Sequence, residues 1–260
     1  LTGKGDWGPP TDRDECIRVL RRAAELGVDF IDTANSYGPY VSEELIREAL
    51  HPYDGVVVAT KAGLLRTGPD QWPVLGFPAY LRQECEMSLR RLGVDTIDLF
   101  QLHRIDDKFP LEDQIGELVA LQSEGKIRHI GLSEVNADQL DAARAITAIA
   151  SVQNMYNLTA RTAESVLEAC EADAIAFIPW FPLAAGPLAA ADGPLQRIAA
   201  DHHATPSQLA LAWLLKRSPV MVPIPGTSKV AHLEENVAAA KIELTEAELD
   251  TLSKAGAAEG

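Results

Sequence analysis

The sequence predicts a (β/α)8 barrel, with its first barrel strand lying before or at residue 1. Short apolar runs rich in strand-forming residues alternate with helical segments through almost the whole chain. Most of these runs are apolar on both faces, which is typical of parallel strands covered by helices. Seven strand–helix units in 260 residues fit a closed barrel better than an open doubly wound sheet. The missing eighth strand is the one expected before residue 1.

The predicted helices begin at recognisable capping patterns. Thr11-x-x-Asp14, Thr205-Pro206-x-Gln208 and Thr245-x-x-Glu248 resemble capping boxes, with Pro206 at a first helical position. Segments 81–91 and 115–123 carry apolar residues at helical spacing. Because no low-complexity linker or composition break interrupts the chain, residues 1–260 are predicted to form a single domain. The predicted strands are 28–33, 55–61, 95–102, 127–132, 149–153, 174–180 and 220–224.

The bulk composition argues against several function classes. The formal net charge is −15 and Lys and Arg are not clustered, so no nucleic-acid partner is expected. The sequence has no uninterrupted apolar stretch of the length that a membrane helix requires, so no membrane partner is expected either. Cys16, Cys85 and Cys170 lie far apart and lack metal-ligand spacing, which predicts neither a disulfide framework nor a metal site. The expected location is the cytoplasm.

Four polar side chains follow the first three predicted strands at the points where those strands end. Asp32 and Lys61 end the first two, His103 follows the third, and Tyr37 lies in the loop after the first. In a parallel barrel these ends share one rim, where active sites lie. Taken singly, each residue has an ordinary structural explanation: a lysine reaching water, a packed loop tyrosine, a turn-capping aspartate or a half-buried histidine. Their combination on adjacent strand ends favours one site.

This combination predicts acid–base chemistry on an oxygen atom. The Lys61 ammonium near the Tyr37 hydroxyl would lower the pKa of the phenol from its usual value near 10, and Asp32 would hold Lys61 in place. His103 would position a substrate oxygen beside Tyr37. A carbonyl group that receives a hydride suits these groups, and hydride transfer requires a nicotinamide cofactor.

Asp32, Tyr37, Lys61 and His103, in this order and setting, resemble the catalytic tetrad of the aldo-keto reductases. The similarity continues in GKIRHIGLSEVN (125–136), SVQNMYN (151–157), IPWFPLAAG (178–186) and PIPGTSKVAHLEENVAA (223–239). It therefore covers nearly the whole chain. The resemblance implies a (β/α)8 barrel that reduces a small carbonyl substrate with NADP(H), as a monomer or a weak homo-oligomer.

The resemblance also assigns cofactor contacts. Ser133 and Gln153 would hydrogen-bond the nicotinamide carboxamide, and Trp180 would stack on the ring. Backbone amides at the helix start after residue 229 would be able to bind phosphate. The remaining expected contacts are Phe181, Pro182 and Leu183 along the pyrophosphate, Gly226, Thr227, Ser228, Lys229 and His232 around the 2′-phosphate and adenosine, and Glu235 and Asn236 at adenine.

Three positions depart from the common pattern of that family. Glu134 stands where asparagine commonly contacts the carboxamide, His232 where many members have arginine, and Gly226 where many have lysine. A neutral histidine lacks the permanent charge of arginine, so a weaker preference for NADPH over NADH is expected. NADP(H) remains the predicted cofactor, with NAD(H) as the weaker alternative.

The substrate-side loops, 5–10 and 64–77, carry Trp7 and Trp72, which together with Trp180 predict a flat aromatic lining. This lining suits planar aromatic aldehydes. The segments GPP, SYGP and PGTSKVAHLEEN are most similar to the branch that includes bacterial pyridoxal reductases, which makes pyridoxal the candidate substrate.

Two other function classes remain open on the sequence. Some relatives with this fold and cofactor act as redox sensors or as regulatory subunits; the presence of all four tetrad residues favours turnover instead. The second alternative is a lyase or aldolase that uses Lys61 as a Schiff-base nucleophile. A paired Asp32 would keep this amine protonated and argues against that chemistry.

Overall fold

The computed structural model describes residues 1–183 and 193–259. By its internal contacts the chain divides into two compact units, which are described separately below. A single domain over residues 1–260 stays a prediction. The first unit comprises Leu1–Ser151 with Gly226–Val230, and the second comprises Val152–Pro225 with Ala231–Gly260.

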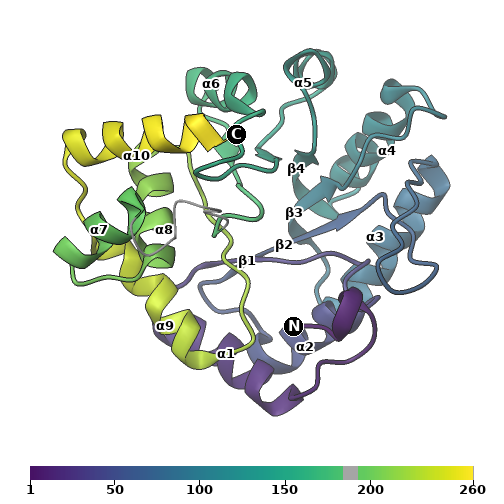
Figure 1. Cartoon of the computed structure of the whole chain (residues 1–260). Coiled ribbons are helices and arrows are strands. Elements are labelled where there is room, and N and C mark those ends of the chain that lie inside the picture. Colours follow the sequence, from purple (N-terminus) through teal and green to yellow (C-terminus); the bar gives the residue numbers. More distant parts are fainter. Residues whose placement is uncertain (184–192, 260) are drawn as a thin grey trace. The chain divides into compact units, whose positions relative to one another are not determined.

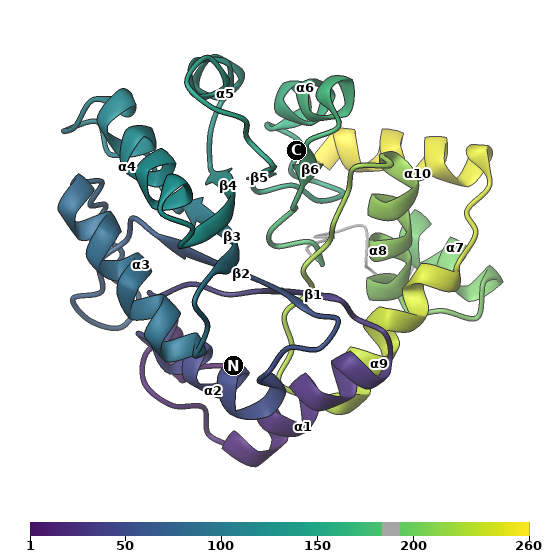
Figure 2. The ribbon, with the colours of Figure 1, turned by 180° about the vertical axis from the view of Figure 1, so that it is seen from behind.

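The first unit is built on four parallel strands in the order β1-β2-β3-β4. Figures 1 and 2 show helices α2, α3 and α4 along one side of these strands. Each predicted strand of this unit is present, with its ends shifted by up to two residues. The elements are α1 (Arg13–Glu25), β1 (Phe30–Asp32), α2 (Val41–Leu50), β2 (Val57–Ala62), α3 (Pro78–Leu92), β3 (Ile97–Leu102), α4 (Leu111–Ser123), β4 (Ile127–Ser133) and α5 (Ala137–Arg144).

The alternation of side chains along β2 decides which polar group reaches the site. Successive side chains of a strand point to opposite faces. Thr60 donates a hydrogen bond to Glu43 of α2 at 2.6 Å, so its side chain is on the helix-covered face. Lys61 therefore points to the other face, where it is fully buried. A register slip of one residue would exchange the two side chains and remove the cation from the site.

The start of α1 differs from the predicted one. Asp12, not Thr11, caps this helix, and its side chain accepts a hydrogen bond from the Glu15 amide at 2.9 Å. Asp12 is the better acceptor because its carboxylate is charged and lies at the positive end of the helix. The capping boxes predicted at 205–208 and 245–248 are confirmed at the starts of α8 (Pro206–Arg217) and α10 (Glu246–Glu259).

The second unit contains most of β5 (Ser151–Gln153), together with β6 (Ala176–Phe177). The strand predicted at 220–224 is wrong: only Met221 pairs there, as a single parallel bridge to Phe177. Phe177 makes both of its ladder hydrogen bonds to this segment, but the next donor in the same register is residue 179, a proline without an N–H, so the pairing does not continue. The helical elements are α6 (Glu164–Asp173), α7 (Pro194–Asp201), α8, most of α9 (Val230–Ala238), η3 (Ala239–Lys241) and α10.

Aromatic rings fill the core of the second unit. Tyr156 stacks on Trp213 with ring centroids 6.1 Å apart and meets the edge of Phe177 at 5.7 Å. All three side chains are buried. Among the described residues, no helix has both the length and the apolar character that a membrane span needs.

Candidate active site

The backbone after β1 brings the Tyr37 loop against the end of β2. The amide of Thr33 donates to the Ala59 carbonyl at 2.8 Å, and the amide of Asn35 donates to the Lys61 carbonyl at 3.2 Å. These bonds continue the parallel pairing beyond the last residue of β1. Tyr37 therefore enters the site beside Lys61, although 24 positions separate the two residues in the chain.

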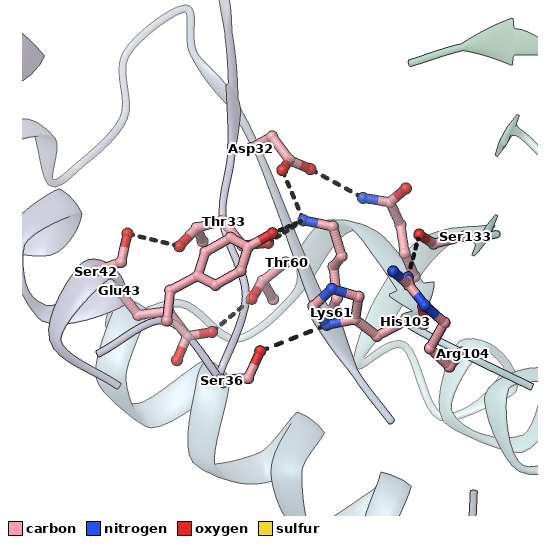
Figure 3. A network of polar contacts seen from close by, with 12 residues as sticks. Asp32, Thr33, Ser36, Ser42, Glu43, Thr60, Lys61, His103, Arg104 and Ser133 are labelled. Carbon is pink, nitrogen blue, oxygen red and sulfur yellow. Dashed lines mark hydrogen bonds and ion pairs between the residues drawn. The ribbon is translucent and has the colours of Figure 1, made fainter. Parts of the chain in front are cut away.

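Lys61 is the centre of the polar network in Figure 3. Its Nζ donates to Asp32 Oδ2 at 2.6 Å, to the Thr33 carbonyl at 2.7 Å and to the Tyr37 hydroxyl at 3.5 Å. The side chain of Lys61 is fully buried and that of Asp32 is only 5% exposed. The ammonium group has three protons, and each has an acceptor. The cation is therefore fixed in place behind the phenol.

Gln101 holds the second oxygen of Asp32 and was not predicted from the sequence. Its Nε2 donates to Asp32 Oδ1 at 3.1 Å, and Gln101 lies opposite Lys61 in the pairing of β2 and β3. Gln101 precedes His103 by two positions, so both lie on the same face of their strand. That spacing was the available signal. Gln101 orients the carboxylate that in turn orients Lys61.

His103 is a neutral imidazole in this environment. Burial, together with the charges of Lys61 and Arg104, holds the pKa of His103 well below its usual value. Its Nδ1 lies 3.5 Å from the Ser36 hydroxyl, and its ring meets the edge of the Tyr37 ring, with centroids 5.9 Å apart. When Nδ1 accepts from Ser36, the single proton of a neutral imidazole is on Nε2. His103 then donates a hydrogen bond without carrying charge.

The prediction that Lys61 brings the pKa of Tyr37 below its usual value is wrong. Burial raises the pKa of Tyr37, and the opposing effect of the Lys61 charge does not overcome it. Desolvation penalises the phenolate, and the nearby carboxylate of Asp32 adds to that penalty. Tyr37 is therefore protonated at neutral pH, which is the form that an acid requires.

The pKa of Lys61 is raised above its usual value. Burial lowers it, but the charge and hydrogen bond of Asp32 and the interaction with Tyr37 outweigh the desolvation. An amine that attacks a carbonyl must first lose its proton. The structure thus argues against Lys61 as a Schiff-base nucleophile.

Two contacts outside the site fix the loop that carries Tyr37. Thr33 Oγ1 donates to Ser42 Oγ at 2.8 Å, and Asn35 Nδ2 donates to Glu84 Oε2 at 2.9 Å. All four side chains are buried. Because helices α2 and α3 supply the partners, the position of the phenol depends on the packing of these helices against the strands.

Arg66 brings together the two tryptophans predicted to line the substrate side. Its guanidinium lies 3.6 Å from the ring centroid of Trp72 and 5.7 Å from that of Trp7, and the Trp72 ring meets the edge of Tyr37 at 6.3 Å. Arg66 was not predicted from the sequence, because nothing in the adjacent segment indicates that its guanidinium stacks on Trp72. The same guanidinium donates to the backbone carbonyls of Gly5, Asp6, Ser36, Gly68 and Gln71.

Of the residues expected at the nicotinamide, Ser133 and Gln153 lie at strand ends, whereas Trp180 lies beyond β6, which is shorter than the strand predicted at 174–180. In the first unit, Ser133 is the last residue of β4 and is buried, and its hydroxyl accepts a hydrogen bond from Arg104 at 3.1 Å. In the second unit, Gln153 is the last residue of β5, and Trp180 forms a parallel bridge with Met155.

In the pyrophosphate segment only Phe181 is exposed, with Pro182 buried and Leu183 half-buried, whereas most of the adenosine residues are exposed. Phe181 is 62% exposed, and its carbonyl accepts from Asn157 at 3.1 Å. Pro182 and Leu183 follow it, whereas residues 184–186 of the predicted motif lie outside the described residues. Gly226 and Ser228 are exposed in the first unit; His232, Glu235 and Asn236 lie on α9 in the second, where only Asn236 is half-buried.

The helix start after the 226–229 loop already binds an anion of the chain itself. The Thr227 hydroxyl accepts from the Lys229 amide at 3.1 Å, and the Val230 amide donates to Glu15 Oε1 at 3.2 Å. The hydrogen bonds from Arg18 and Val230 lower the pKa of Glu15, so this carboxyl is ionised at neutral pH. The expected phosphate-binding amides are therefore not all available, because Glu15 occupies one of them.

A phenol backed by a buried ammonium–carboxylate pair, beside a neutral histidine at the ends of parallel strands, is chemically suited to exchange a proton with an oxygen atom. The chain belongs to the aldo/keto reductase family, whose model matches residues 2–257. It is therefore an oxidoreductase that works with a nicotinamide cofactor.

Two curated relatives are similar over almost their whole length. An uncharacterized oxidoreductase of Schizosaccharomyces pombe (strain 972) is 54% identical over 259 residues, which cover all of this chain and 85% of that protein. Pyridoxine 4-dehydrogenase of Escherichia coli (strain K12) is 44% identical over 259 residues, which cover 97% of this chain and 90% of that protein.

A solved structure confirms the predicted fold class. An aldo/keto reductase from Klebsiella pneumoniae in complex with NADP and acetate matches with a TM-score of 0.81 and 30% identity, covering 93% of this chain and 85% of that one. The fold class is thus the (β/α)8 barrel of the family. The NADP in that relative agrees with the cofactor predicted here.

Proposed function

We propose that this enzyme reduces an aldehyde or ketone to the alcohol with NADPH, and that Tyr37 is the general acid. One observation carries the proposal: the Tyr37 hydroxyl accepts a hydrogen bond from Lys61 at 3.5 Å. A hydroxyl that accepts from a cation keeps its own proton for another acceptor. The buried ammonium also stabilises the phenolate that forms when this proton leaves.

The roles of the side chains follow from their protonation states. The neutral His103 donates its Nε2 proton in a hydrogen bond to the carbonyl oxygen, which places that oxygen beside Tyr37. The hydride for the carbonyl carbon would come from NADPH when this cofactor is bound. Tyr37 gives its proton to the oxygen, and the alcohol is formed. Asp32 and Gln101 keep Lys61 positioned throughout.

The residues expected at the nicotinamide are chemically suited to bind it. The Ser133 hydroxyl accepts from Arg104, which leaves its proton for the oxygen of a carboxamide. Gln153 offers both an acceptor and donors, and Trp180 offers a flat ring for stacking. Glu134, where the family commonly has asparagine, is ionic and cannot replace an amide donor.

The proposal is tested by titrating the protein with NADPH and then with NADH while tryptophan emission is followed. We expect saturable quenching by both cofactors, with the smaller Kd for NADPH. A panel of aldehydes beginning with pyridoxal then follows, with NADPH oxidation measured by its loss of near-ultraviolet absorbance. Folded protein that binds neither cofactor would overturn the proposal, and oxidation of only one equivalent of cofactor would favour the sensor alternative.

Pyridoxal is the proposed substrate because two independent observations favour a planar aromatic aldehyde. The Escherichia coli relative at 44% identity is named for its action on pyridoxine, the corresponding alcohol. In the first unit, Trp72 stacks under Arg66 and meets the edge of Tyr37, so a flat apolar ring lies next to the proposed acid. Stacking of an aromatic substrate on such a ring is favourable.

Replacing Trp72 with alanine is expected to raise the KM for pyridoxal about fivefold, because an aromatic contact of this kind contributes on the order of 1 kcal/mol. The Kd for NADPH should stay the same. Trp72→Phe is the matched control, since phenylalanine keeps a ring under Arg66 and should retain most of the affinity. An equal rise in KM for a small aliphatic aldehyde would show a loop defect rather than lost stacking.

Removal of the Glu15 charge is expected to increase the preference for NADPH over NADH. The ionised carboxylate binds the Val230 amide and acts on Lys229, in the loop expected to meet the 2′-phosphate. Glu15→Gln keeps an acceptor for the Val230 amide but removes the repulsion between the Glu15 carboxylate and the 2′-phosphate of NADPH. The Kd for NADPH should therefore fall severalfold at low salt and less at high salt. The Kd for NADH should not change.

The matched control for this prediction is Glu25→Gln. Glu25 is exposed at the other end of α1, where it pairs with Arg22. This variant removes the same charge without changing the 226–229 loop. If both variants shift the affinity ratio of NADPH and NADH equally, the general field of the protein, and not Glu15, sets that ratio.

A further inference from the structure

Arg104 connects the catalytic histidine to the residue expected to hold the nicotinamide. It follows His103 directly in the chain, and its Nη1 donates to the His103 carbonyl at 2.6 Å and to Ser133 Oγ at 3.1 Å (Figure 3). The side chain is half-buried. One guanidinium nitrogen therefore bridges the end of β3 and the end of β4.

This bridge fixes the direction in which Ser133 can donate. A serine hydroxyl has one proton and can accept through its lone pairs. Because Arg104 can only donate, Ser133 must be the acceptor in their hydrogen bond. The hydroxyl proton is then left for an acceptor on the other side, and the carboxamide oxygen is the matching group. Ser133 itself is 1% exposed, so water does not compete freely for this proton.

Charges of opposite sign flank Ser133. Burial lowers the pKa of Arg104 from its usual value, and the electrostatic interactions with Glu134 and Tyr37 act in the opposite direction. Arg104 remains a cation at neutral pH, since arginine is effectively always protonated. Glu134 follows Ser133 in the chain and has a left-handed backbone conformation with φ of 56°, which is uncommon for a residue other than glycine. Its conformation ends β4 directly beside Ser133.

We propose that Arg104 is a positioning residue which orients Ser133 toward the nicotinamide carboxamide, and that Arg104 and Glu134 set the relative affinities for NADPH and NADP⁺ by their opposite charges. This inference rests on the proposed function. The nicotinamide ring is neutral in NADPH and cationic in NADP⁺, so Arg104 disfavours the oxidised cofactor and Glu134 favours it. If NADP⁺ binds more tightly than NADPH, carbonyl reduction is inhibited by its cofactor product. If NADPH binds more tightly, alcohol oxidation is inhibited in the same way.

The test compares Kd values for NADPH and NADP⁺, measured by fluorescence in the wild type and in three variants. Arg104→Gln should shift the ratio of the two Kd values about tenfold toward NADP⁺, on the scale of a unit charge at a few ångströms in a partly buried site. Glu134→Gln should shift it toward NADPH. In the double variant the two shifts should largely cancel, because both charges are gone.

Arg104→Lys separates orientation from charge. Lysine keeps the cation but not the fixed planar geometry of the guanidinium. We expect this variant to keep the wild-type ratio of Kd values while binding both cofactors more weakly than the wild type. Arg128→Gln is the matched control, since Arg128 is an exposed cation of β4 that pairs with Asp98, and neither Kd should change.

The outcomes separate this inference from the proposed function. If the wild type binds neither NADPH nor NADP⁺, the proposed function fails. If the wild type binds both but Arg104→Gln and Glu134→Gln leave the ratio unchanged, or move it in the same direction, only this inference is overturned. Thermal melts of each variant identify a misfolded protein. If Arg104→Gln is misfolded, the ratios of Kd values of Arg104→Lys and Glu134→Gln are compared with that of the wild type instead.

Discussion

Replacing Tyr37 with phenylalanine is expected to lower kcat/KM for aldehyde reduction about 1000-fold, within the range that a positioned general acid contributes. The variant keeps the ring and its edge contacts with Trp72 and His103, and loses only the hydroxyl that accepts from Lys61. The Kd for NADPH should remain close to that of the wild type. Steady-state kinetics and the fluorescence titration measure the two quantities independently.

Tyr40→Phe is the control for this variant. Tyr40 lies three positions further along the same loop, is 40% exposed, and packs its ring under Arg91 at 4.2 Å. Phenylalanine preserves that contact, so activity should be unchanged. Full activity of Tyr37→Phe would remove Tyr37 as the acid; loss of activity in both variants would indicate that the loop, rather than the phenol, had been disturbed.

The sequence predicted the tetrad because each of its polar residues stands at or just after the end of an apolar run. Strand ends could be located to within about two residues from the local pattern, and parallel pairing brings those ends to one edge. Where a side chain follows the period of two, its face was also predictable, as for Lys61. The strand predicted at 220–224 is absent because its partner has Pro179 where the next ladder donor would be needed, which the apolar pattern of 220–224 does not reveal.

The supporting contacts could not be predicted, because they join residues with no local relation. Gln101 and Asp32 are 69 positions apart, Arg66 and the Asp6 carbonyl 60, and Glu15 and Val230 215. Apart from the two-residue spacing between Gln101 and His103, nothing in its own segment marks any of these residues. Such pairs are decided by the three-dimensional arrangement of loops, about which sequence periodicity carries no information.

The pKa of Tyr37 is a further case in which geometry was needed. A cation near a phenol lowers its pKa, and that rule was available from the sequence. The net direction depends on how much hydration the phenol loses, and here burial outweighs the charge of Lys61. Tyr37 is therefore protonated at neutral pH, and in the proposed mechanism Lys61 stabilises the phenolate once the proton has left.

Replacing Lys61 with methionine is expected to lower the rate of reduction by at least about 100-fold at neutral pH, in the range of general-acid catalysis, because the phenolate loses its nearby cation. Reduction needs protonated Tyr37, so the rate falls as the pH rises through the pKa of this residue. Lys61 lowers that pKa, and its removal must raise it further. The alkaline limb of the rate profile should therefore move to higher pH; an unaltered limb would show that Lys61 and Tyr37 are not coupled.

The same substitution should lower the free energy of unfolding by about 3 to 5 kcal/mol, because it leaves the buried Asp32 carboxylate without its cation. Urea unfolding at neutral pH measures this loss. The double variant Asp32→Asn with Lys61→Met removes both charges, so it should recover most of the stability and none of the activity. If stability and activity returned together, Lys61 would serve only to hold the strands. If stability returned alone, the positive charge of Lys61 is needed for proton transfer by Tyr37. The double variant keeps the space behind the phenol filled, through Gln101 and the side chain introduced by Asp32→Asn, but supplies no charge there.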